Sequence, residues 1–259
     1  MPITLTTDFG DAGPFVGVMK AMIRRYAPDA EITDLTHHIA PCMPAEAGFW
    51  LSRSYRYFPA GSVHVAVVDP GVGTARAVLA CAWDGHLFLA PDNGILPMIV
   101  PPGTPMHRLS DAWAARQDWP QPSRTFHGRD IFAPLAAMLA SGKALPADIG
   151  PACQPMPPAA AAAVRNADGT LTGCVVAIDT WGNLISNIDA ALLRTLPAPR
   201  VTIAGRSLRL ADTYGSAQPG DLLALVNSFD VLEIACREGH AAQRLGVRHG
   251  ERVSVNAGG

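Results

Sequence analysis

The first half of the chain alternates between short apolar runs and segments in which apolar residues recur every three or four positions. The run of Val63, Val65, Val67 and Val68 is β-branched, as buried strands often are, whereas the segment after Pro14 has helical spacing. The pattern predicts strands at residues 3–6, 31–35, 63–68, 77–82 and 86–89, and helices at 15–26, 44–57 and 130–141. Strands that alternate with helices predict an N-terminal α/β domain over residues 1–150, with a mostly parallel sheet.

The second half of the chain changes to a pattern of short strands. Residues 151–169 are rich in proline and alanine, a composition typical of a linker. Beyond them, short apolar runs occur at residues 171–178, 184–187, 200–203, 207–210, 222–226, 231–235 and 252–255. Many short strands joined by turns predict a smaller C-terminal antiparallel β-barrel domain over residues 170–259.

Polar loops follow the apolar runs of the first half at four points, residues 7–10, 69–74, 90–94 and 126–130. In an open α/β sheet, ligands bind at the edge formed by the carboxyl ends of the strands. Glycines in such loops let backbone N–H groups approach a ligand closely. Asp8, in the first loop, suits a bidentate hydrogen bond to vicinal hydroxyls, although a turn or N-cap aspartate explains it as well.

Three residues in or next to these loops have the greatest capacity for chemistry: Asp69, Arg76 and His127. An unperturbed histidine titrates near pH ~6.5 and can accept a proton at neutral pH. An arginine beside an aspartate keeps the carboxylate ionised. Together the three could orient and partly deprotonate a water molecule. The alternative is a buried structural ion pair between Asp69 and Arg76, with His127 capping the helix that follows it.

Two strand ends in the second half also carry polar groups. Asp179 and Asn183 follow one apolar strand, and Ser228 lies in the turn after another. Asp179 could bind an ammonium group, and the amide of Asn183 offers the paired donor and acceptor that match an adenine edge. Ordinary β-turn chemistry explains these residues nearly as well.

Composition narrows the classes of function. The net charge is −2 and the pI is about 6.4, so nothing in the charge favours nucleic acid or an anionic membrane as a partner. No apolar run reaches the roughly eighteen residues of a membrane span, and the first residues do not resemble a signal peptide. The five cysteines are widely spaced and form no CxxC pair, which predicts reduced thiols in a cytoplasmic protein.

Motifs of several enzyme classes and of metal sites are missing. Neither the P-loop GxxxxGKS/T nor the dinucleotide motif GxGxxG is present, and there is no GxSxG elbow of an acyl-transfer hydrolase. No HxH or HxxxH pair or cysteine pattern suggests a metal. The other histidines lack a matching carboxylate context and are predicted to lie at the surface or in loops: His37, His38, His64, His86, His107, His240 and His249.

Six motifs in fixed order together point to one family: TLTTDFG, VVDPGVGT-x-R, LAPDNG, FHGRDIFAP, IDTWGNLISNI and LVNSFDVLEIA. In order and spacing they resemble the S-adenosyl-L-methionine (SAM) hydroxide adenosyltransferases, which share a superfamily with fluorinating and chlorinating enzymes that use the same substrate. The resemblance covers nearly the whole chain. It implies an N-terminal α/β domain, a linker and a C-terminal β-barrel, assembled as a homotrimer with sites at subunit interfaces. SAM would be the substrate, and no cofactor is implied.

The resemblance also implies a role for each candidate residue. Asp69, Arg76 and His127 match the family's water-activating triad. The other matches are to substrate contacts: Asp8 to the ribose hydroxyls, Asp179 and Ser228 to the methionine part, Asn183 to adenine, and Tyr214 to the aromatic ring that packs on the base.

Four positions depart from the family pattern without touching the triad. Cys42 stands where the halogenases carry a tryptophan over the ligand, and Gly13 replaces an acidic residue before Pro14. Phe229 fills a position that is usually small or basic, and Arg237 stands where asparagine is more usual. Each could alter the affinity for the substrate.

The chemistry of this family favours hydrolysis over halide transfer for this chain. Cleavage of the ribose C5′–sulfur bond releases a neutral thioether, so the step needs an activated nucleophile rather than a general acid. The halogenases have tyrosine where this chain has Asp69, and an ionised Asp69 would repel a halide and attract a water proton. Gly128 resembles the chlorinating branch, but the prediction is hydrolysis of SAM to adenosine and L-methionine. A SAM-dependent chlorinase and a non-catalytic SAM- or adenosine-binding protein are the alternatives.

Overall fold

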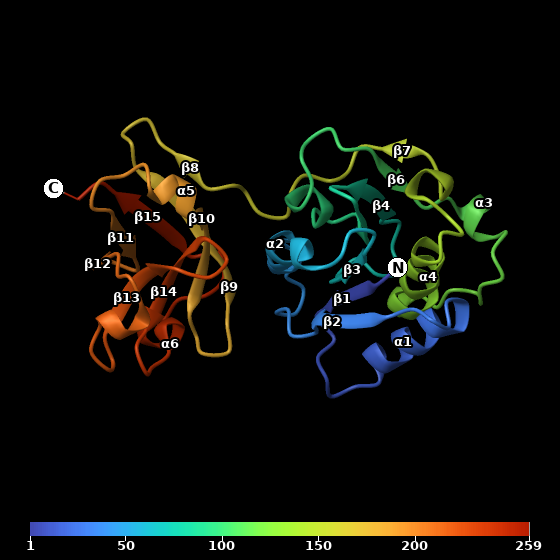
Figure 1. The fold of residues 1–259 in the computed structure, drawn as a ribbon, viewed down its shortest axis with the longest axis horizontal. Coiled ribbons are helices and arrows are strands. Elements are labelled where there is room, and N and C mark those ends of the chain that lie inside the picture. The colour runs from blue at the N-terminus through green and yellow to red at the C-terminus, as the bar shows by residue number, and fades with distance from the viewer. Residues whose placement is uncertain (259) are drawn as a thin grey trace. The chain divides into compact units, whose positions relative to one another are not determined.

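The chain consists of two compact units, Met1–Ala160 and a second unit from Ala161 onward. The computed structural model describes residues 1–258, and Figure 1 shows each unit built around its own sheet. The boundary between the units falls inside the segment predicted as a linker. Parts of that segment nevertheless belong to sheets, because β7 (Ala152–Cys153) pairs with β6 (Met106–Arg108) and β8 (Val164–Arg165) pairs with β9 (Leu171–Ile178).

The first unit is an α/β domain with a seven-stranded sheet in the order β2-β1-β3-β5-β4-β6-β7. Neighbours among β2, β1, β3 and β5 are parallel, and β4, β6 and β7 add antiparallel pairs at one side. The remaining strands are β1 (Ile3–Thr7), β2 (Ile32–Thr36), β3 (Val63–Val67), β4 (Val78–Trp83) and β5 (His86–Pro91). The tight turn between β4 and β5 is Asp84-Gly85, both with positive φ, as a two-residue hairpin requires.

Helices cover both faces of this sheet. The helices are α1 (Phe15–Tyr26), α2 (Pro44–Ser54), α3 (Asp111–Ala114) and α4 (Ala133–Ala140), with short helical turns at Tyr55–Tyr57, Leu96–Met98 and Pro146–Asp148. Side chains of β3 alternate between the two faces: Val65 packs with α1 and α4, and Ala66 packs with α2. A π-helical turn, Gly128–Phe132, precedes α4, where the sequence pattern predicts the start of an ordinary helix.

Two histidines of this unit, His64 and His86, are buried strand residues, which contradicts the surface or loop position predicted for them. His37 is also buried, but it lies in the loop after β2, as predicted. The ring of His64 is fully buried and lies within hydrogen-bonding distance of Thr4 (2.8 Å) and His86 (3.1 Å). Burial, aided by the charge of His86, lowers the pKa of His64 to about 3. The apolar pattern of β3 and β5 therefore accommodates neutral imidazoles as core side chains.

The second unit is an antiparallel barrel. Its sheet has the order β12-β11-β15-β9-β10-β14-β13, and a bridge between Leu210 and Ala224 brings the two edge strands together. The inner face buries an apolar cluster that includes Leu171, Leu184 and Val253. The remaining elements are β10 (Leu184–Asp189), β11 (Arg200–Ile203), β12 (Arg206–Arg209), β13 (Leu222–Val226), β14 (Val231–Cys236), β15 (Arg252–Asn256), α5 (Ala190–Leu193), α6 (Ala241–Leu245) and a helical turn at Tyr214–Ser216.

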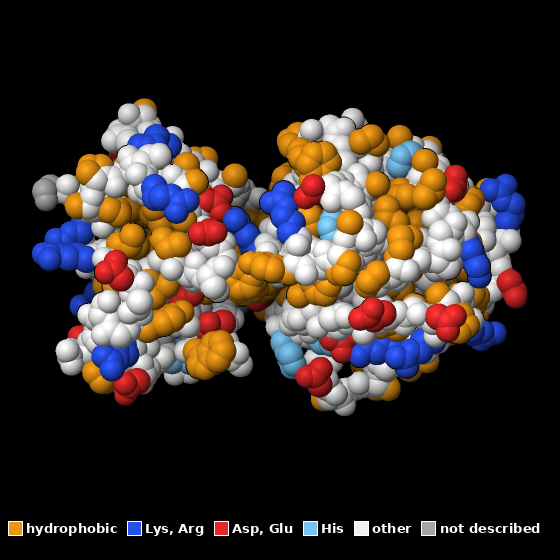
Figure 2. Space-filling model, viewed as in Figure 1, with side chains coloured by type: hydrophobic (Ala, Val, Ile, Leu, Met, Phe, Trp, Pro, Cys, Tyr) orange, Lys and Arg blue, Asp and Glu red, His pale blue; other side chains and the backbone are white. Residues whose placement is uncertain are grey.

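The two folds confirm the predicted class, an α/β domain with a smaller antiparallel β-barrel domain. On the face shown in Figure 2, acidic and basic side chains are intermixed on each unit, in keeping with the net charge of −2. Within residues 1–258, no helix combines the length and the apolar character needed to cross a bilayer.

Candidate active site

The parallel pairing of β1 with β3 places two acidic side chains at the same edge of the sheet. Thr7, the last residue of β1, pairs with Val67, the last residue of β3. Asp8 and Asp69 follow these strand ends by one and two residues, so both carboxylates lie at the carboxyl edge of the sheet.

The loop after β3 folds back so that Arg76 lies against Asp69. Arg76 Nε donates to both Asp69 carboxylate oxygens at 2.9 Å, and Nη2 also donates to Oδ2. The turn depends on Gly73, which has φ +77° and lies so close to the backbone of Arg124 that a Cβ would be 2.2 Å from the Arg124 carbonyl oxygen. Thr74 closes the turn by donating from its hydroxyl to the Gly71 carbonyl. Both charged side chains are nearly buried, which makes this a desolvated ion pair.

His127 completes the cluster from a different part of the chain. Its Nδ1 lies 2.9 Å from Arg76 Nη2. The side chain makes no capping hydrogen bond to the helical turn that follows, so the capping role considered for it is not realised. Its segment is fixed by Asp130, which accepts a hydrogen bond from the Ser123 backbone at 2.8 Å.

The contact with Arg76 determines the tautomer of His127. A guanidinium can only donate, so Nδ1 of His127 must be the acceptor and the ring proton of the neutral form resides on Nε2. Burial and the neighbouring charge of Arg76 lower the pKa of His127, and Asp69, Asp130 and the Ser123 backbone only partly offset them. At neutral pH the ring is therefore neutral, and its acceptor nitrogen Nδ1 already accepts the hydrogen bond from Arg76. The carboxylate of Asp69 lines the cavity and retains a lone pair that can accept a hydrogen bond from a water molecule there.

A cavity of about 350 Å³ opens beside these groups. Asp8, Asp69 and His127 line it, together with Cys42 and aromatic side chains. The rings of Phe9, Phe15 and Phe126 are in mutual edge or tilted contact, with centroids 5.3–6.0 Å apart. The cavity thus combines an apolar wall with a few convergent polar groups, as small-molecule sites usually do.

Two of the departures from the family pattern shape this cavity. Cys42 has φ +61°, and its backbone N–H donates to Asp8 Oδ2 at 3.0 Å, which fixes one carboxylate oxygen of Asp8. Asp8 is therefore not the N-cap of α1, whose N-terminal position is taken by Pro14. A Cβ at Gly13 would lie 2.8 Å from the ring of Phe15, so glycine allows this ring its position.

The second unit holds the other candidate residues. Asp179 accepts hydrogen bonds from the backbone N–H and the side-chain amide of Asn183, at 2.8 and 2.9 Å, which is the turn chemistry considered for these residues. The Tyr214 hydroxyl donates to Glu233 at 2.6 Å, and Asn227, the neighbour of Ser228, donates to the same carboxylate at 3.1 Å. The structure thus links the segments that carry Tyr214 and Ser228 through Glu233.

Sequence reasoning did not single out Glu233. Its side chain is only 3% exposed, and burial raises its pKa. The signal is visible in retrospect, because it is an acidic residue inside the apolar run of the motif LVNSFDVLEIA. Asp179 lies near enough to raise the pKa of both Tyr214 and Glu233 as well.

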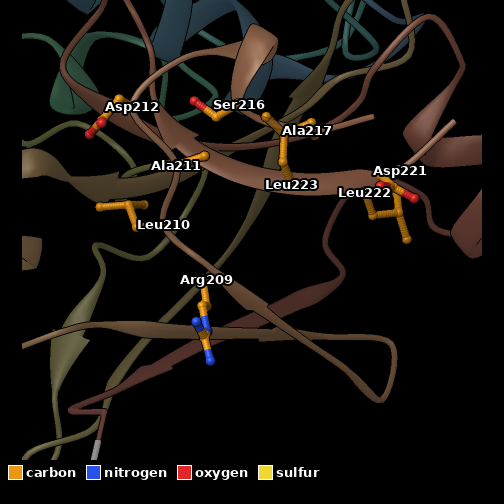
Figure 3. A pocket seen from close by; sticks show the side chains of 9 residues that line it. All are labelled: Arg209, Leu210, Ala211, Asp212, Ser216, Ala217, Asp221, Leu222 and Leu223. Atoms are coloured by element: carbon orange, nitrogen blue, oxygen red, sulfur yellow. The ribbon is translucent and has the colours of Figure 1, made fainter. Parts of the chain in front are cut away.

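A second cavity of about 530 Å³ lies elsewhere on the barrel. Figure 3 shows its side chains, among them Arg209, Asp212 and Asp221, spread around a wide depression without converging on one point. None of the predicted residues lines it. We assign the candidate active site to the smaller cavity of the first unit, because Asp69 and His127, which both contact Arg76, line it.

No arrangement of three or more histidine, cysteine or acidic side chains suited to a metal ion occurs within the described residues 1–258. The five cysteines are all free thiols.

Comparison with known proteins identifies the family. Residues 3–150 match the model of the SAM hydroxide adenosyltransferase N-terminal domain, and residues 173–254 match the model of the C-terminal domain. A relative named (R)-S-adenosyl-L-methionine hydrolase from Salinispora arenicola is 39% identical, with 99% of this chain and 98% of the relative covered. A relative of the same name from Thermus thermophilus is 34% identical, with 98% and 99% covered.

A solved structure has the same fold over nearly the whole chain. It is the crystal structure of an uncharacterized conserved protein from Thermotoga maritima, with a TM-score of 0.86 and 33% identity, and the match covers 99% of this chain and 100% of that one. The two domain models, the full-length relatives and the common fold agree with one another. The chain therefore belongs to the SAM hydroxide adenosyltransferase family.

Proposed function

We propose that this protein hydrolyses SAM to adenosine and L-methionine. Water attacks the ribose C5′ atom, the C5′–sulfur bond breaks, its electron pair stays on sulfur, and one proton is released. The observation that carries the proposal is the contact of Arg76 with both Asp69 and His127 beside a cavity that Asp8, Asp69 and His127 line. The full-length relatives named as SAM hydrolases support it.

Asp69 is the group that orients the attacking water and accepts its proton. Arg76 holds the carboxylate in place with donors on both oxygens, and His127 holds Arg76 by accepting from Nη2. A positioned base contributes about 10²–10⁴-fold to the rate, and in-line positioning of the water contributes several kcal/mol more. The group that leaves C5′ is the neutral thioether of L-methionine, which needs no proton, so no general acid is required.

The substrate contacts follow the family resemblance. Asp8 binds the ribose hydroxyls through the oxygen that Cys42 leaves available. The C-terminal unit supplies the remaining contacts: Asp179 and Ser228 to the methionine part, Asn183 to adenine and Tyr214 to the face of the base. The half-exposed ring of Tyr214 supports its role.

The reaction needs neither a metal nor a redox cofactor, because the sulfonium activates C5′ by itself. Incubation with a chelator is expected to leave the rate unchanged. We further propose that the protein is a homotrimer with its sites at subunit interfaces, as the resemblance implies, and that it acts in the cytoplasm, where its five free thiols would stay reduced. Light scattering should then give three times the 27.3 kDa of the chain.

The decisive experiment incubates the purified protein with SAM in heavy-oxygen water. Adenosine and L-methionine should form in equal amounts, with the label in the 5′-hydroxyl of adenosine. The two sulfonium epimers should be supplied separately, because the relatives are named for the (R) epimer. Formation of 5′-chloro-5′-deoxyadenosine in excess chloride would establish a chlorinase instead, and saturable binding without turnover would establish a binding protein.

A further inference from the structure

Glu233 occupies an unusual place for an acidic side chain. It is the third residue of β14, between Leu232 and Ile234, which both pack into the barrel core. Because side chains alternate along a strand, Glu233 faces the opposite side of the sheet from these two. On that side Ala235 packs with Ala211 and Ala217, the residues that flank the Tyr214 turn. The carboxylate is thus buried beneath the segment that presents Tyr214.

Each oxygen of this carboxylate accepts a hydrogen bond from a different segment. Oε1 accepts from the Tyr214 hydroxyl at 2.6 Å, and Oε2 accepts from Asn227 Nδ2 at 3.1 Å. Two donors on two oxygens suit the ionised form, and hydrogen bonds to an ionised acceptor are roughly twice as strong as neutral ones. The short Tyr214 contact is of this kind.

The bond to Asn227 fixes the turn that follows β13. Because the side-chain NH₂ of Asn227 is held by Glu233, its Oδ1 points to the turn and accepts from the backbone N–H of Phe229 at 2.9 Å. The turn includes Asp230, which has φ +57°, a left-handed conformation that is uncommon for residues other than glycine. Ser228 lies within this turn, so its position depends on the orientation of the Asn227 amide.

The Tyr214 segment has a second attachment to the same strand. Arg237, one of the departures from the family pattern, directly follows β14 and donates from Nη1 to the Ala217 carbonyl at 2.5 Å. This bond fixes the end of the segment, whereas Glu233 fixes the ring itself. Arg237 therefore holds the backbone of the segment, and Glu233 holds the hydroxyl of Tyr214.

We infer that Glu233 is a positioning residue that sets the adenine-contacting ring of Tyr214 and the methionine-contacting turn at Ser228 in one geometry. The inference rests on the proposed function, which assigns those two contacts. Its distinctive consequence is that loss of one buried carboxylate weakens binding of both product fragments, although the two segments lie on opposite sides of β13 in the sequence.

The test uses the full-length protein and measures kcat, KM and the inhibition constants of adenosine and of L-methionine. Glu233→Gln keeps the size of the side chain but cannot accept from both donors. Loss of a hydrogen bond to a charged group corresponds to about tenfold or more in binding. We therefore expect KM and both inhibition constants to rise by about tenfold, with kcat within about threefold of wild type, because the Asp69 cluster is intact.

Variants of one segment at a time separate the two hydrogen bonds of Glu233, to Tyr214 and to Asn227. Tyr214→Phe removes only the ring hydroxyl and should weaken adenosine binding alone. Asn227→Ala removes the side chain that holds the turn at Ser228 and adds no charge beside Glu233, so it should weaken L-methionine binding alone. For adenosine, Glu233→Gln combined with Tyr214→Phe should be no worse than Glu233→Gln. Glu31→Gln, at an exposed glutamate of the first unit, is the matched control and should change nothing.

The outcomes distinguish this inference from the proposed function. If the wild type cleaves SAM but Glu233→Gln leaves both inhibition constants unchanged, or lowers only the melting temperature, the positioning role is wrong. If Glu233→Gln does not fold, the two single-segment variants decide, and equal effects of each on both fragments would overturn the inference. A wild type that neither binds nor cleaves SAM would remove both proposals.

Discussion

Asparagine in place of Asp69 removes one charge from the loop after β3 and keeps the size of the side chain. In the wild type the carboxylate is 6% exposed and Arg76 is 10% exposed, and Arg76 Nε lies 2.9 Å from each carboxylate oxygen. In the variant one oxygen becomes an NH₂ group that faces the guanidinium, donor against donor. Removal of one partner of a buried pair costs about 3–5 kcal/mol, so the N-terminal unit should lose stability of that order.

The same variant removes the proposed proton acceptor for the attacking water. We expect kcat to fall by about 10²–10⁴-fold, which corresponds to about 3–5 kcal/mol in activation free energy. The affinity for SAM should stay within about tenfold, because the carboxylate acts on the water rather than on the substrate. A fall in kcat without a matching fall in affinity is therefore the expected signature.

The assay follows adenosine formation by chromatography and SAM binding by calorimetry, at a temperature well below the melting transition of the variant. Asp84→Asn is the matched control, since Asp84 also pairs with an arginine Nε, at 3.1 Å from Arg56, but on the surface. The control should leave kcat unchanged and should lower the free energy of unfolding by no more than the contribution of a surface ion pair, about 0–1 kcal/mol. Turnover by Asp69→Asn within about threefold of wild type would refute the assigned role.

Three further changes test other parts of the structure. Arg76→Met should raise the pKa of His127, because burial still lowers it but the neighbouring positive charge is gone; an NMR titration of the ring that shows no rise would contradict this. The pKa of His64 is about 3 in the folded protein and about 6.5 in the unfolded chain, so the unfolded chain binds a proton first as the pH falls. The free energy of unfolding of the wild type should therefore fall by about 2 kcal/mol from pH 7 to pH 5. His64→Phe removes this group and should lose less stability over the same range, as measured by urea unfolding. Gly182→Ala places a methyl group 2.0 Å from the imidazole of His240, which caps α6, and should lower both the stability and the affinity for SAM. Gly205→Ala is the control: Gly205 has a similar φ but no atom within 4 Å of the added Cβ, so only backbone strain should lower its stability. Equal melting temperatures of the two variants would contradict this.

The hydrophobic pattern determined the class of each unit. The β-branched run at Val63 reads as a buried strand because only a strand with both faces covered tolerates continuous apolar residues, and β3 indeed packs on both sides. The short strands of the second half likewise predicted the barrel. The pattern missed β6 and β7, which are too short and too polar to give a periodic signal and exist because β4 offers an open edge. It also placed His64 at the surface or in a loop, since burial of a neutral imidazole depends on partners such as Thr4 that lie far away in sequence.

The residue types of the site were visible in the sequence, but their relations were not. Asp69 and Arg76 are seven residues apart, and a turn at Gly73 was enough to suggest that they meet. His127 joins them from 51 residues beyond Arg76, and only the fold decides that its Nδ1 faces the guanidinium and is thereby an acceptor. Glu233 was overlooked for the same reason, because a buried acid has meaning only through the two donors that it holds. Sequence determines which groups are available, whereas the direction of each hydrogen bond depends on tertiary contacts between distant segments, and that direction decides which group can take a proton.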